Sequence, residues 1–251
     1  MPSKRIQDYF EPYTRKKQAP APRSLSRSLG SSVAHIKHAG VPGLSVISEF
    51  ITPDEESSLL AFLDAQPWRT DLSRRTMHYG GSYCLMPPRD ATPLQRRAIE
   101  QQVMSAPKIP SELNVLLERM IDEGLYSADT KPEYCIVNEY LPGQGISAHV
   151  ENFRFGEPVC SLTLAGDDSM RFHELRSADD GSVRSGKASV APRTGRSVDA
   201  RLCRRSLAVL TRDARYKWQH EIVRGRKAKP IGWRRVSLTF RTEKRGNSIA
   251  R

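Results

Sequence analysis

The sequence predicts a β-rich core, a sandwich or barrel, that is covered on one side by helices. Three observations indicate this α+β class of fold. Two amphipathic helix signals lie in the first half of the chain, six short β-rich segments follow, and turn residues separate those segments. Runs of strands after helices, without a regular βαβ alternation, are typical of such architectures.

Each helix has its own start signal. Thr52 is predicted to cap the first helix, with Pro53 at the first helical position and acidic residues in the first turn. The apolar residues of this helix are Leu59, Leu60, Phe62 and Leu63. A second helix is expected over residues 111–124, with Ser111 as its cap. Its apolar residues recur at helical spacing and are Leu113, Leu116, Leu117 and Met120.

The β-rich segments combine β-branched and aromatic residues with turn residues at their ends. They span residues 134–140, 159–164, 169–174, 206–210, 216–222 and 235–241. Residues 176–200 are rich in Ser, Arg and Gly, and we interpret them as a polar loop inserted between two strands. We expect a disordered basic tail over residues 1–40, a folded domain over 41–245 and a second disordered tail over 246–251.

Basic residues are clustered rather than evenly spread. The chain of 251 residues carries 40 Lys and Arg against 28 Asp and Glu, a formal net charge of +12. Eight basic residues against two acids lie in residues 1–40, seven against one in 182–205, and ten against one in 224–251. Clustered cations suit a polyanion, because each Lys or Arg placed on a phosphate releases a counterion. We therefore expect nucleic acid as a partner; basic tails that merely keep the protein soluble are the alternative.

Features of three other protein classes do not occur in the sequence. There is no stretch of about 18 apolar residues, so no membrane span is expected, and no apolar signal core is seen at the N-terminus. The four cysteines form no CxxC pair and are Cys84, Cys135, Cys160 and Cys203. We expect reduced thiols, without a zinc site or a disulfide framework, in a cytosolic or nuclear protein.

An H-x-E motif, His149-Val-Glu151, follows a predicted strand and a turn rich in Gly. Residues i and i+2 of an extended segment point to the same side, so His149 and Glu151 can reach one metal ion. His220 lies 71 residues later on another predicted strand. Two imidazoles and one carboxylate leave three coordination positions open, a set that suits non-haem Fe(II). By itself the motif is common, and solvated side chains are the alternative.

Arg235 and Arg241 lie six residues apart in the last predicted strand. The even spacing puts both on one face, while the other face carries Val236, Leu238 and Phe240, which suit a core. Two inward-pointing arginines need anionic partners, because unpaired buried charge is unfavourable. The two carboxylates of 2-oxoglutarate would satisfy them, since guanidinium binds carboxylate through paired hydrogen bonds. An edge strand with solvated arginines is the alternative.

Seven short motifs follow one another along the chain. They are Asn138-Glu-Tyr140, Pro142-Gly-Gln-Gly-Ile146, His149-Val-Glu151, Ser161-Leu-Thr-Leu164, Arg205-Ser-Leu207, Arg215-Tyr-Lys-Trp-Gln-His220 and Arg235-Val-Ser-Leu-Thr-Phe-Arg241. In order and spacing they resemble the AlkB family of Fe(II)/2-oxoglutarate-dependent dioxygenases, and the segment from Arg74 to Gly80 resembles its nucleotide-lid region. The resemblance extends from about Val41 to Arg241. It implies an all-β core with flanking helices, arranged as a double-stranded β-helix (jelly roll).

The resemblance also implies roles for individual residues. The catalytic iron would be ligated by His149, Glu151 and His220. The cosubstrate 2-oxoglutarate would be bound by Asn138, Tyr140, Arg235 and Arg241, with Arg235 at its distal carboxylate and Arg241 at the carboxylate near the metal.

Two positions depart from the family's pattern. Glu151 stands where the family usually has Asp, and its extra methylene moves the carboxylate by about 1.5 Å; we expect iron to bind and catalysis to be retained. Ala165 precedes Gly166 where the family more often has Gly directly after Leu, which affects the local turn. Trp218 would share the inward face with His220, as a pocket wall or as core, and His173 is expected in the surface or core rather than the site.

The first ten residues contain Ser3-Lys-Arg-Ile-Gln-Asp-Tyr-Phe10, which resembles the peptide that docks on the replication sliding clamp, PCNA. Ile6, Tyr9 and Phe10 would form a hydrophobic plug on a single 3₁₀ turn, although Ser3 replaces the usual leading Gln. An apolar cluster in a disordered tail favours a partner. Folding back onto the domain is the alternative.

The resemblance implies an oxidoreductase that uses Fe(II), 2-oxoglutarate and O2 to remove alkyl groups from nucleic-acid bases. We expect a monomeric, nuclear (or nuclear and cytoplasmic) enzyme of DNA alkylation repair that binds no membrane. DNA is favoured over RNA by the clamp-like peptide and the basic segments. One alternative is an RNA- or tRNA-modifying dioxygenase, because the motif from Arg215 to His220 is similar to that of relatives that hydroxylate wobble uridines. Another is a catalytically impaired nucleic-acid-binding protein, because Glu151 replaces Asp.

Overall fold

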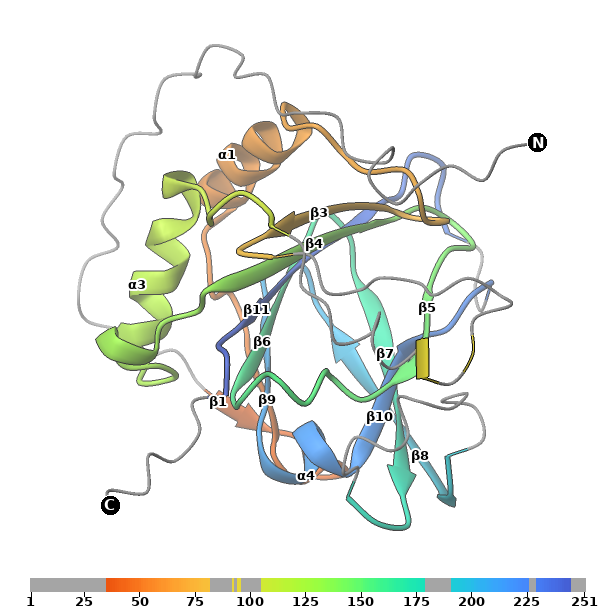
Figure 1. Cartoon of the computed structure of the whole chain (residues 1–251). Helices are drawn as coiled ribbons and strands as arrows, with labels where there is room; N and C mark the ends of the chain where they lie inside the picture. The colour runs from red at the N-terminus through yellow and green to blue at the C-terminus, as the bar shows by residue number, and fades with distance from the viewer. Residues whose placement is uncertain are drawn as a thin grey trace.

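Two antiparallel β-sheets that face each other form the body of the protein (Figure 1). The computed structural model describes residues 35–81, 92, 94–95, 105–178, 191–225 and 229–244. One sheet has seven strands in the order β1-β2-β9-β6-β11-β4-β3, and the other has four in the order β5-β10-β7-β8. This is the double-stranded β-helix that the sequence predicted.

Three strands have the bounds that the sequence predicted, because each is β-rich and buried over almost its whole length: β4, β6 and β11. The seven-stranded sheet consists of β1 His35–Lys37, β2 Leu44–Ile47, β3 Arg75–Tyr79, β4 Tyr134–Tyr140, β6 Val159–Leu164, β9 Leu207–Leu210 and β11 Arg235–Arg241. The four-stranded sheet consists of β5 Ile146–His149, β7 Asp168–Leu175, β8 Arg193–Leu202 and β10 Trp218–Ile222.

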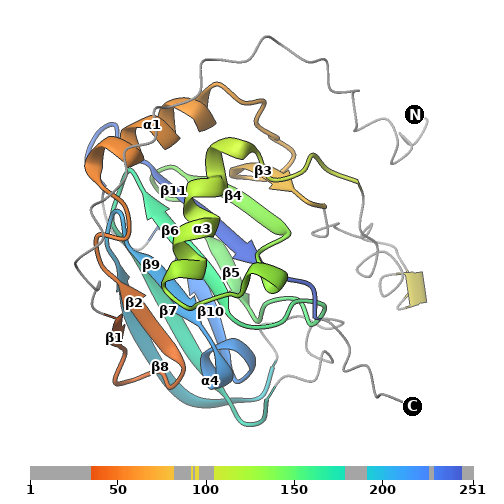
Figure 2. The ribbon, with the colours of Figure 1, turned by 90° about the vertical axis from the view of Figure 1, so that its left-hand side faces the viewer.

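The two longer helices cover the face of the seven-stranded sheet that is turned away from the four-stranded sheet (Figure 2). The helical elements are α1 Pro53–Asp64, η2 Ser111–Leu113, α3 Asn114–Asp122, η3 Ala128–Thr130 and α4 Arg212–Tyr216. No helix among the described residues is long and apolar enough to cross a membrane.

The start of α1 is the predicted one. Thr52 Oγ1 accepts from the backbone N–H of Glu55 at 3.2 Å, and the Glu55 carboxylate accepts from the N–H of Thr52 at 2.8 Å. This capping box satisfies two donors that have no partner inside the helix. Arg119 of α3 binds the same carboxylate at 2.6 Å and the carbonyl of Phe50 at 2.8 Å, so the two helices are joined at this corner.

Ser111 does not cap the second helix, and the prediction was wrong. Ser111 is the first residue of the 3₁₀ turn η2, and its hydroxyl donates to the Glu112 carboxylate at 3.1 Å. The α-helical hydrogen bonds of α3 begin at Asn114, behind an N-cap, Leu113, that has no side-chain acceptor. Leu113 is fully buried, so packing of this leucine fixes the helix start in place of a cap.

The two faces of β11 differ as its alternating pattern predicted. The face turned toward the helices carries Val236, Leu238 and Phe240, which are fully buried in one core cluster. That cluster includes helix residues Leu59, Leu63, Leu113 and Leu116. The opposite face lines a cavity between the two sheets with Arg235, Ser237, Thr239 and Arg241.

The seven-stranded sheet is joined to α1 by a chain of ion pairs that includes the buried carboxylate of Glu139. Glu139 of β4 is 2% exposed and accepts from Arg75 of β3 at 2.5 and 2.7 Å. It also accepts from Arg234, next to β11, at 3.2 Å, and Arg234 pairs with Asp64 of α1 at 2.6 Å. Because two arginines share this carboxylate, Glu139 keeps a cationic partner if either of them is lost.

Three segments differ from the sequence prediction. The strand β1, His35–Lys37, pairs with β2 although it lies in the range expected as a disordered tail, 1–40; its side chains are exposed, so no apolar pattern marks it. Residues 193–202 belong to β8, not to the expected 176–200 loop, and they pair with β7 along nearly their whole length. Most of their side chains are exposed because β8 is an edge strand, so the apolar alternation that marks a strand is missing. Tyr216 ends the short helix α4 and does not begin a strand; the strand β10 starts at Trp218. The rest of the predicted loop, residues 179–190, lies outside the described residues, as do Cys84 and the clamp-like residues 3–10.

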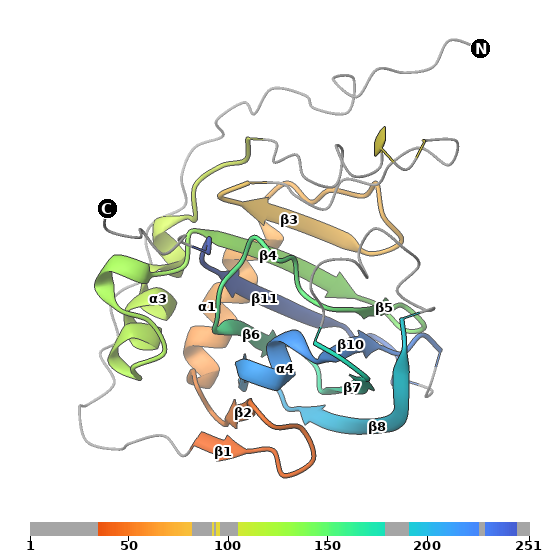
Figure 3. The same ribbon diagram turned by 60° about the horizontal axis from the view of Figure 1, so that its bottom comes forward.

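The short helix α4 lies just before β10 and is fixed by the chain before β2 (Figure 3). Thr211 donates to the Gly43 carbonyl from its backbone N–H at 2.9 Å, and the N–H of Ala214 donates to the Pro42 carbonyl at 2.9 Å. Gly43 has φ +86, and a Cβ there would lie 2.1 Å from the Thr211 carbonyl oxygen. A glycine is therefore required for this contact.

Candidate metal centre and cosubstrate pocket

The two imidazoles of the predicted ligand set come from neighbouring strands. His149 ends β5, and His220 lies directly opposite it in the β5–β10 ladder. Their ring centroids are 4.4 Å apart. Glu151, two residues beyond His149, places a carboxylate oxygen 3.9 Å from His149 Nε2 and 3.5 Å from His220 Nε2. The three possible ligand atoms lie within 4.8 Å of one another.

The His149 ring is oriented by the backbone. Its Nδ1 lies 2.8 Å from the carbonyl oxygen of Ser147. A carbonyl can only accept, so Nδ1 carries the proton and the Nε2 lone pair is left toward Glu151 and His220. Metal-ligating histidines usually have such a hydrogen bond at the second nitrogen. Two imidazole nitrogens and one carboxylate are a donor set that fits a divalent iron centre.

Glu151 is buried, with 5% exposure, and its carboxylate is bonded to Arg241. Arg241 Nε donates at 2.7 Å and a terminal nitrogen at 3.0 Å. Burial acts to raise the pKa of Glu151, but the Arg241 guanidinium, together with His220 and His149, holds this pKa well below its usual value. The carboxylate is therefore deprotonated, as a metal ligand must be.

Arg235 lies on the same face of β11 as Arg241 but is bonded differently. It is 1% exposed, donates to Thr163 Oγ1 at 3.0 Å, and lies over the Tyr140 ring at 5.4 Å. Its Nε is buried and has no hydrogen-bond partner among the described residues. Burial lowers the pKa of Arg235, with Tyr140 and Asp168 acting against that shift. A buried guanidinium with an open donor fits the carboxylate of a bound anion.

One cavity brings together all the residues that the sequence assigned to metal and cosubstrate. These residues are Asn138, Tyr140, His149, Glu151, His220, Arg235 and Arg241. Asn138 accepts from Arg74 Nε at 2.8 Å through its side-chain oxygen, and its amide N–H groups have no partner among the described residues. Val159, Met170, Leu210 and Ile222 form apolar walls of the same cavity.

Trp218 and His173 do not reach this cavity's ligand cluster. Trp218 is 1% exposed and packs in the core cluster between the two sheets, which favours its interpretation as core. His173 lies on β7 beside Phe172, the residue that faces His220 in the ladder, and bonds Glu221 at 2.8 Å. Its side chain therefore belongs to the other face of that sheet.

Sequence reasoning missed two residues that bond the predicted site. Thr163 of β6 binds Arg235, and Arg74 binds Asn138. Both contacts depend on the registers of β6 with β11 and of β3 with β4, which no local pattern reveals. Arg74 had a weak signal, because it starts the segment that resembles the nucleotide lid.

The fold and the cavity define an oxygenase of the Fe(II)- and 2-oxoglutarate-dependent class. The family model of the 2OG-Fe(II) oxygenase superfamily matches residues 43–241. The chain belongs to this superfamily and, within it, to the AlkB family. Enzymes of this family are oxidoreductases that use Fe(II), 2-oxoglutarate and O2, so these are the cofactors of the chain.

The chain is similar to several curated proteins. It is 33% identical over 219 residues to the "Alkylated DNA repair protein ALKBH8 homolog" of Arabidopsis thaliana, with 80% of this chain and 58% of that protein covered. It is 30% identical over 206 residues to the uncharacterized protein L905 of Acanthamoeba polyphaga mimivirus, with 79% and 84% covered. A macaque tRNA (carboxymethyluridine(34)-5-O)-methyltransferase, ALKBH8, is 28% identical over 192 residues, and the match covers 24% of that protein. The chain thus spans little more than half of the plant relative and a quarter of the macaque one.

A solved structure supports the fold. "The structure of OsALKBH1" superposes with a TM-score of 0.52 at 17% identity and covers 80% of this chain and 98% of that one. At this identity the likeness concerns the double-stranded β-helix alone.

Proposed function

We propose that this enzyme oxidises modified bases in nucleic acid, with iron ligated by His149, Glu151 and His220. The observation that carries the proposal is the convergence of these three side chains in one cavity beside the buried Arg235, whose Nε has no partner in the described part of the chain. The 2-oxoglutarate molecule is bound by Arg235, with Asn138 and Tyr140 beside it in the cavity. Arg241, which the resemblance assigns to the carboxylate near the metal, has two nitrogens on the Glu151 carboxylate.

When bound, Fe(II) with 2-oxoglutarate and O2 supplies the oxidising chemistry that hydroxylates the substrate and yields succinate and CO2. The chain's own residues position the reactants and exclude water. Arg235 binds one end of the cosubstrate and Tyr140 lies against the guanidinium, while the apolar walls limit side reactions. A base within duplex nucleic acid has to leave the stack to reach such a cavity, and a single-stranded or mismatched base does so at the lowest energy.

Alkylated DNA is the first candidate substrate. The clamp-like residues 3–10 would bring the enzyme to replicating DNA, and the basic segments would bind its phosphates. Oxidation of an N-linked methyl group would release it as formaldehyde and restore the base. For this role we propose a nuclear (or nuclear and cytoplasmic) localisation.

Transfer RNA is the second candidate substrate, and it is favoured by similarity to relatives. One relative is named as a tRNA (carboxymethyluridine(34)-5-O)-methyltransferase, and another, from Arabidopsis thaliana, as an RNA demethylase. The match to the RNA demethylase, ALKBH9B, covers 44% of this chain at 25% identity. Hydroxylation of a uridine side chain needs the same iron and cosubstrate groups.

One experiment separates these candidates. Methylated DNA, methylated RNA and whole tRNA are incubated with the full chain, Fe(II), 2-oxoglutarate and ascorbate, and the bases are analysed by mass spectrometry. Loss of methyl groups from DNA favours repair, whereas a mass gain of one oxygen on tRNA uridine favours tRNA modification. Iron-dependent succinate release with no base changed in any arm would contradict the nucleic-acid proposal. Absence of succinate release at saturating metal would favour the catalytically impaired alternative.

Clamp docking is tested separately. Ile6→Ala with Phe10→Ala should remove binding of the protein to PCNA, measured by calorimetry, and leave activity on free oligonucleotides unchanged. A wild-type chain that gives no binding heat with PCNA would end the docking proposal without affecting the iron site.

A further inference from the structure

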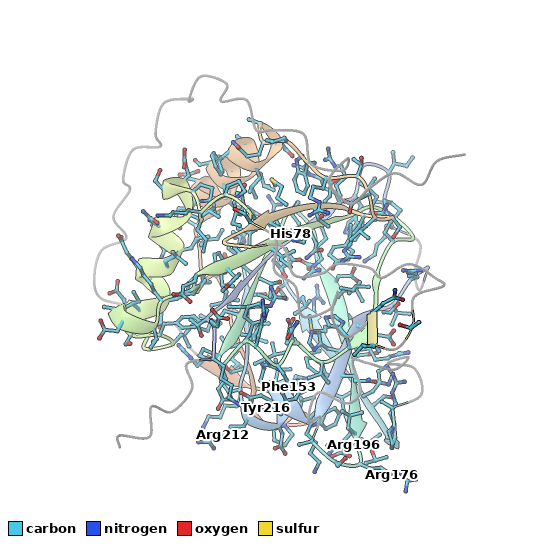
Figure 4. The ribbon with its side chains drawn as sticks, viewed as in Figure 1. His78, Phe153, Arg176, Arg196, Arg212 and Tyr216 are labelled. Atoms are coloured by element: carbon cyan, nitrogen blue, oxygen red, sulfur yellow. The ribbon has the colours of Figure 1, made fainter. Side chains whose placement is uncertain are left out.

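One buried arginine outside the cavity contacts the loop that carries Glu151. Arg215 of α4 is 1% exposed, and its guanidinium lies 4.7 Å from the Tyr216 ring centroid. Its nitrogens point at the loop of residues 151–156, which follows β5. In Figure 4 the labelled Phe153 of that loop and Tyr216 lie side by side, and their ring centroids are 6.3 Å apart.

Four backbone carbonyls of this loop accept hydrogen bonds from Arg215. The terminal nitrogens donate to Glu151 at 3.1 Å, to Asn152 at 2.8 Å and to Phe155 at 2.7 Å. Nε donates to Gly156 at 3.3 Å. A guanidinium is suited to this task, because its five N–H groups form a fixed planar fork. Four carbonyl dipoles converging on one buried cation also compensate its loss of hydration.

The first of these carbonyls belongs to Glu151 itself. The loop is also bonded to the segment after β11: Gly156 N–H donates to the Thr242 carbonyl at 3.1 Å, and Lys244 N–H donates to the Arg154 carbonyl at 2.6 Å. Arg215 bonds both ends of the loop, and of its four acceptors only the Glu151 carbonyl belongs to a predicted metal ligand. The other end of the same side chain, the carboxylate, is bonded by Arg241. Two arginines therefore hold the two ends of one glutamate.

The segment that carries Arg215 also carries a metal donor. His220 lies five residues after Arg215, and α4 is joined to Pro42 and Gly43 by three hydrogen bonds. These bonds anchor α4, and Arg215 with it, to the chain before β2, and only Lys217 separates α4 from β10. A shift of the 151–156 loop would move Glu151 away from His220. The four hydrogen bonds from Arg215 oppose such a shift and so keep the Glu151 carboxylate close to the His220 imidazole.

We propose that Arg215 is a positioning residue for the metal centre, which sets the place of the Glu151 backbone so that the longer glutamate side chain reaches the metal. The proposal rests on Glu151 as an iron ligand and not on which nucleic acid is the substrate. Outer partners of metal ligands typically change metal affinity by about 10- to 100-fold when they are removed.

The test compares two substitutions in the full chain. Arg215→Met keeps most of the side-chain volume and removes all donors, and Arg215→Lys keeps the charge with fewer, differently placed donors. Co(II) serves as the metal probe, and its dissociation constant is measured from the absorption of the bound ion without any substrate. We expect affinity to fall by about 10- to 100-fold in Arg215→Met and by less in Arg215→Lys.

Arg119→Met is the matched control. Arg119 also donates to a backbone carbonyl and lies near an aromatic ring, that of Phe50 at 5.7 Å, but between α1 and α3. We expect it to lower the melting temperature while Co(II) affinity stays as in the wild type. Wild-type Co(II) affinity in a folded Arg215→Lys and Arg215→Met, or an equal loss in Arg119→Met, would overturn the proposal. If Arg215→Met does not fold, wild-type affinity in Arg215→Lys alone overturns it. Absence of Co(II) binding in the wild type would instead refute the ligand set.

Discussion

The two ends of β11 present the same side chain to the same cavity in different bonding states. Arg241 has two nitrogens on the buried Glu151 carboxylate, whereas Arg235 is also buried but has an Nε without a partner among the described residues. A paired buried arginine contributes to the folded state, and removing it leaves its partner charged and unmatched. A buried arginine with an unsatisfied N–H donor can instead bind the carboxylate of an anionic cosubstrate. The difference teaches that residue type and strand face do not settle the role of an arginine; its bonding does.

The largest loss of activity is expected when one of the three metal ligands is removed. His220→Ala leaves two of three ligands, so we expect succinate formation to fall to background. His173→Ala is the control, because His173 is on the adjacent strand of the same sheet and turns to the other face. Near-wild-type turnover in His220→Ala would refute the site.

The two arginines should differ in their effects on stability and binding. Arg241→Met leaves Glu151 buried without its cation, and we expect the free energy of unfolding to fall by about 3–5 kcal/mol. Arg235→Met removes an incompletely bonded charge, so stability should be unchanged or higher. Its KM for 2-oxoglutarate should rise by about 30-fold or more, the loss expected when one partner of a buried charge pair is removed. Urea unfolding and 2-oxoglutarate titration measure both effects; equal destabilisation by the two variants would break the comparison.

Glu151→Asp tests whether the cavity requires the longer glutamate side chain at the position that pairs with Arg241. Shortening the side chain withdraws the carboxylate by about 1.5 Å, so it cannot keep both Arg241 bonds and its place between the histidines. We expect Co(II) affinity to fall on the order of tenfold, equivalent to about 1.4 kcal/mol. Tighter binding by the aspartate variant would mean that the cavity is not adapted to glutamate.

The smallest expected effect is the contribution of His78 to the pH dependence of the free energy of unfolding. His78 lies on β3 (Figure 4), is 9% exposed, and burial, with the cations Arg69, Arg241 and Arg74, lowers its pKa to about 4. The unfolded chain binds a proton on this residue near pH 6.5, so stability is complete above that pH and falls as the pH drops toward 4. We expect a loss of about 1 kcal/mol between pH 7.5 and 5.5, measured by urea unfolding. His78→Gln should remove this part of the pH dependence; an unchanged slope would show that other groups cause it.

The sequence predicted what depends on local pattern. The capping box of α1 and the strands β4, β6 and β11 follow from cap chemistry and alternation, and so does the shared face of Arg235 and Arg241. It did not predict β8, because an edge strand with solvent on most of its side chains needs no apolar residues. The start of α3 was also missed, since burial of Leu113 replaces a cap.

Bonding between distant residues could not be predicted. Arg241 with Glu151 and Arg215 with the 151–156 loop join residues that are 90 and about 60 positions apart. Whether an arginine in such a cavity is paired depends on the registers of several strands. The sequence placed the groups in one site but did not assign their partners.

The contact of Gly43 with Thr211 has a genetic consequence. Any larger residue at position 43 must push α4, and with it the segment that ends in His220. A saturation screen for loss of iron loading would therefore recover Gly43 variants in which every ligand is intact. Inactive alleles of this enzyme should map to this turn as well as to the cavity.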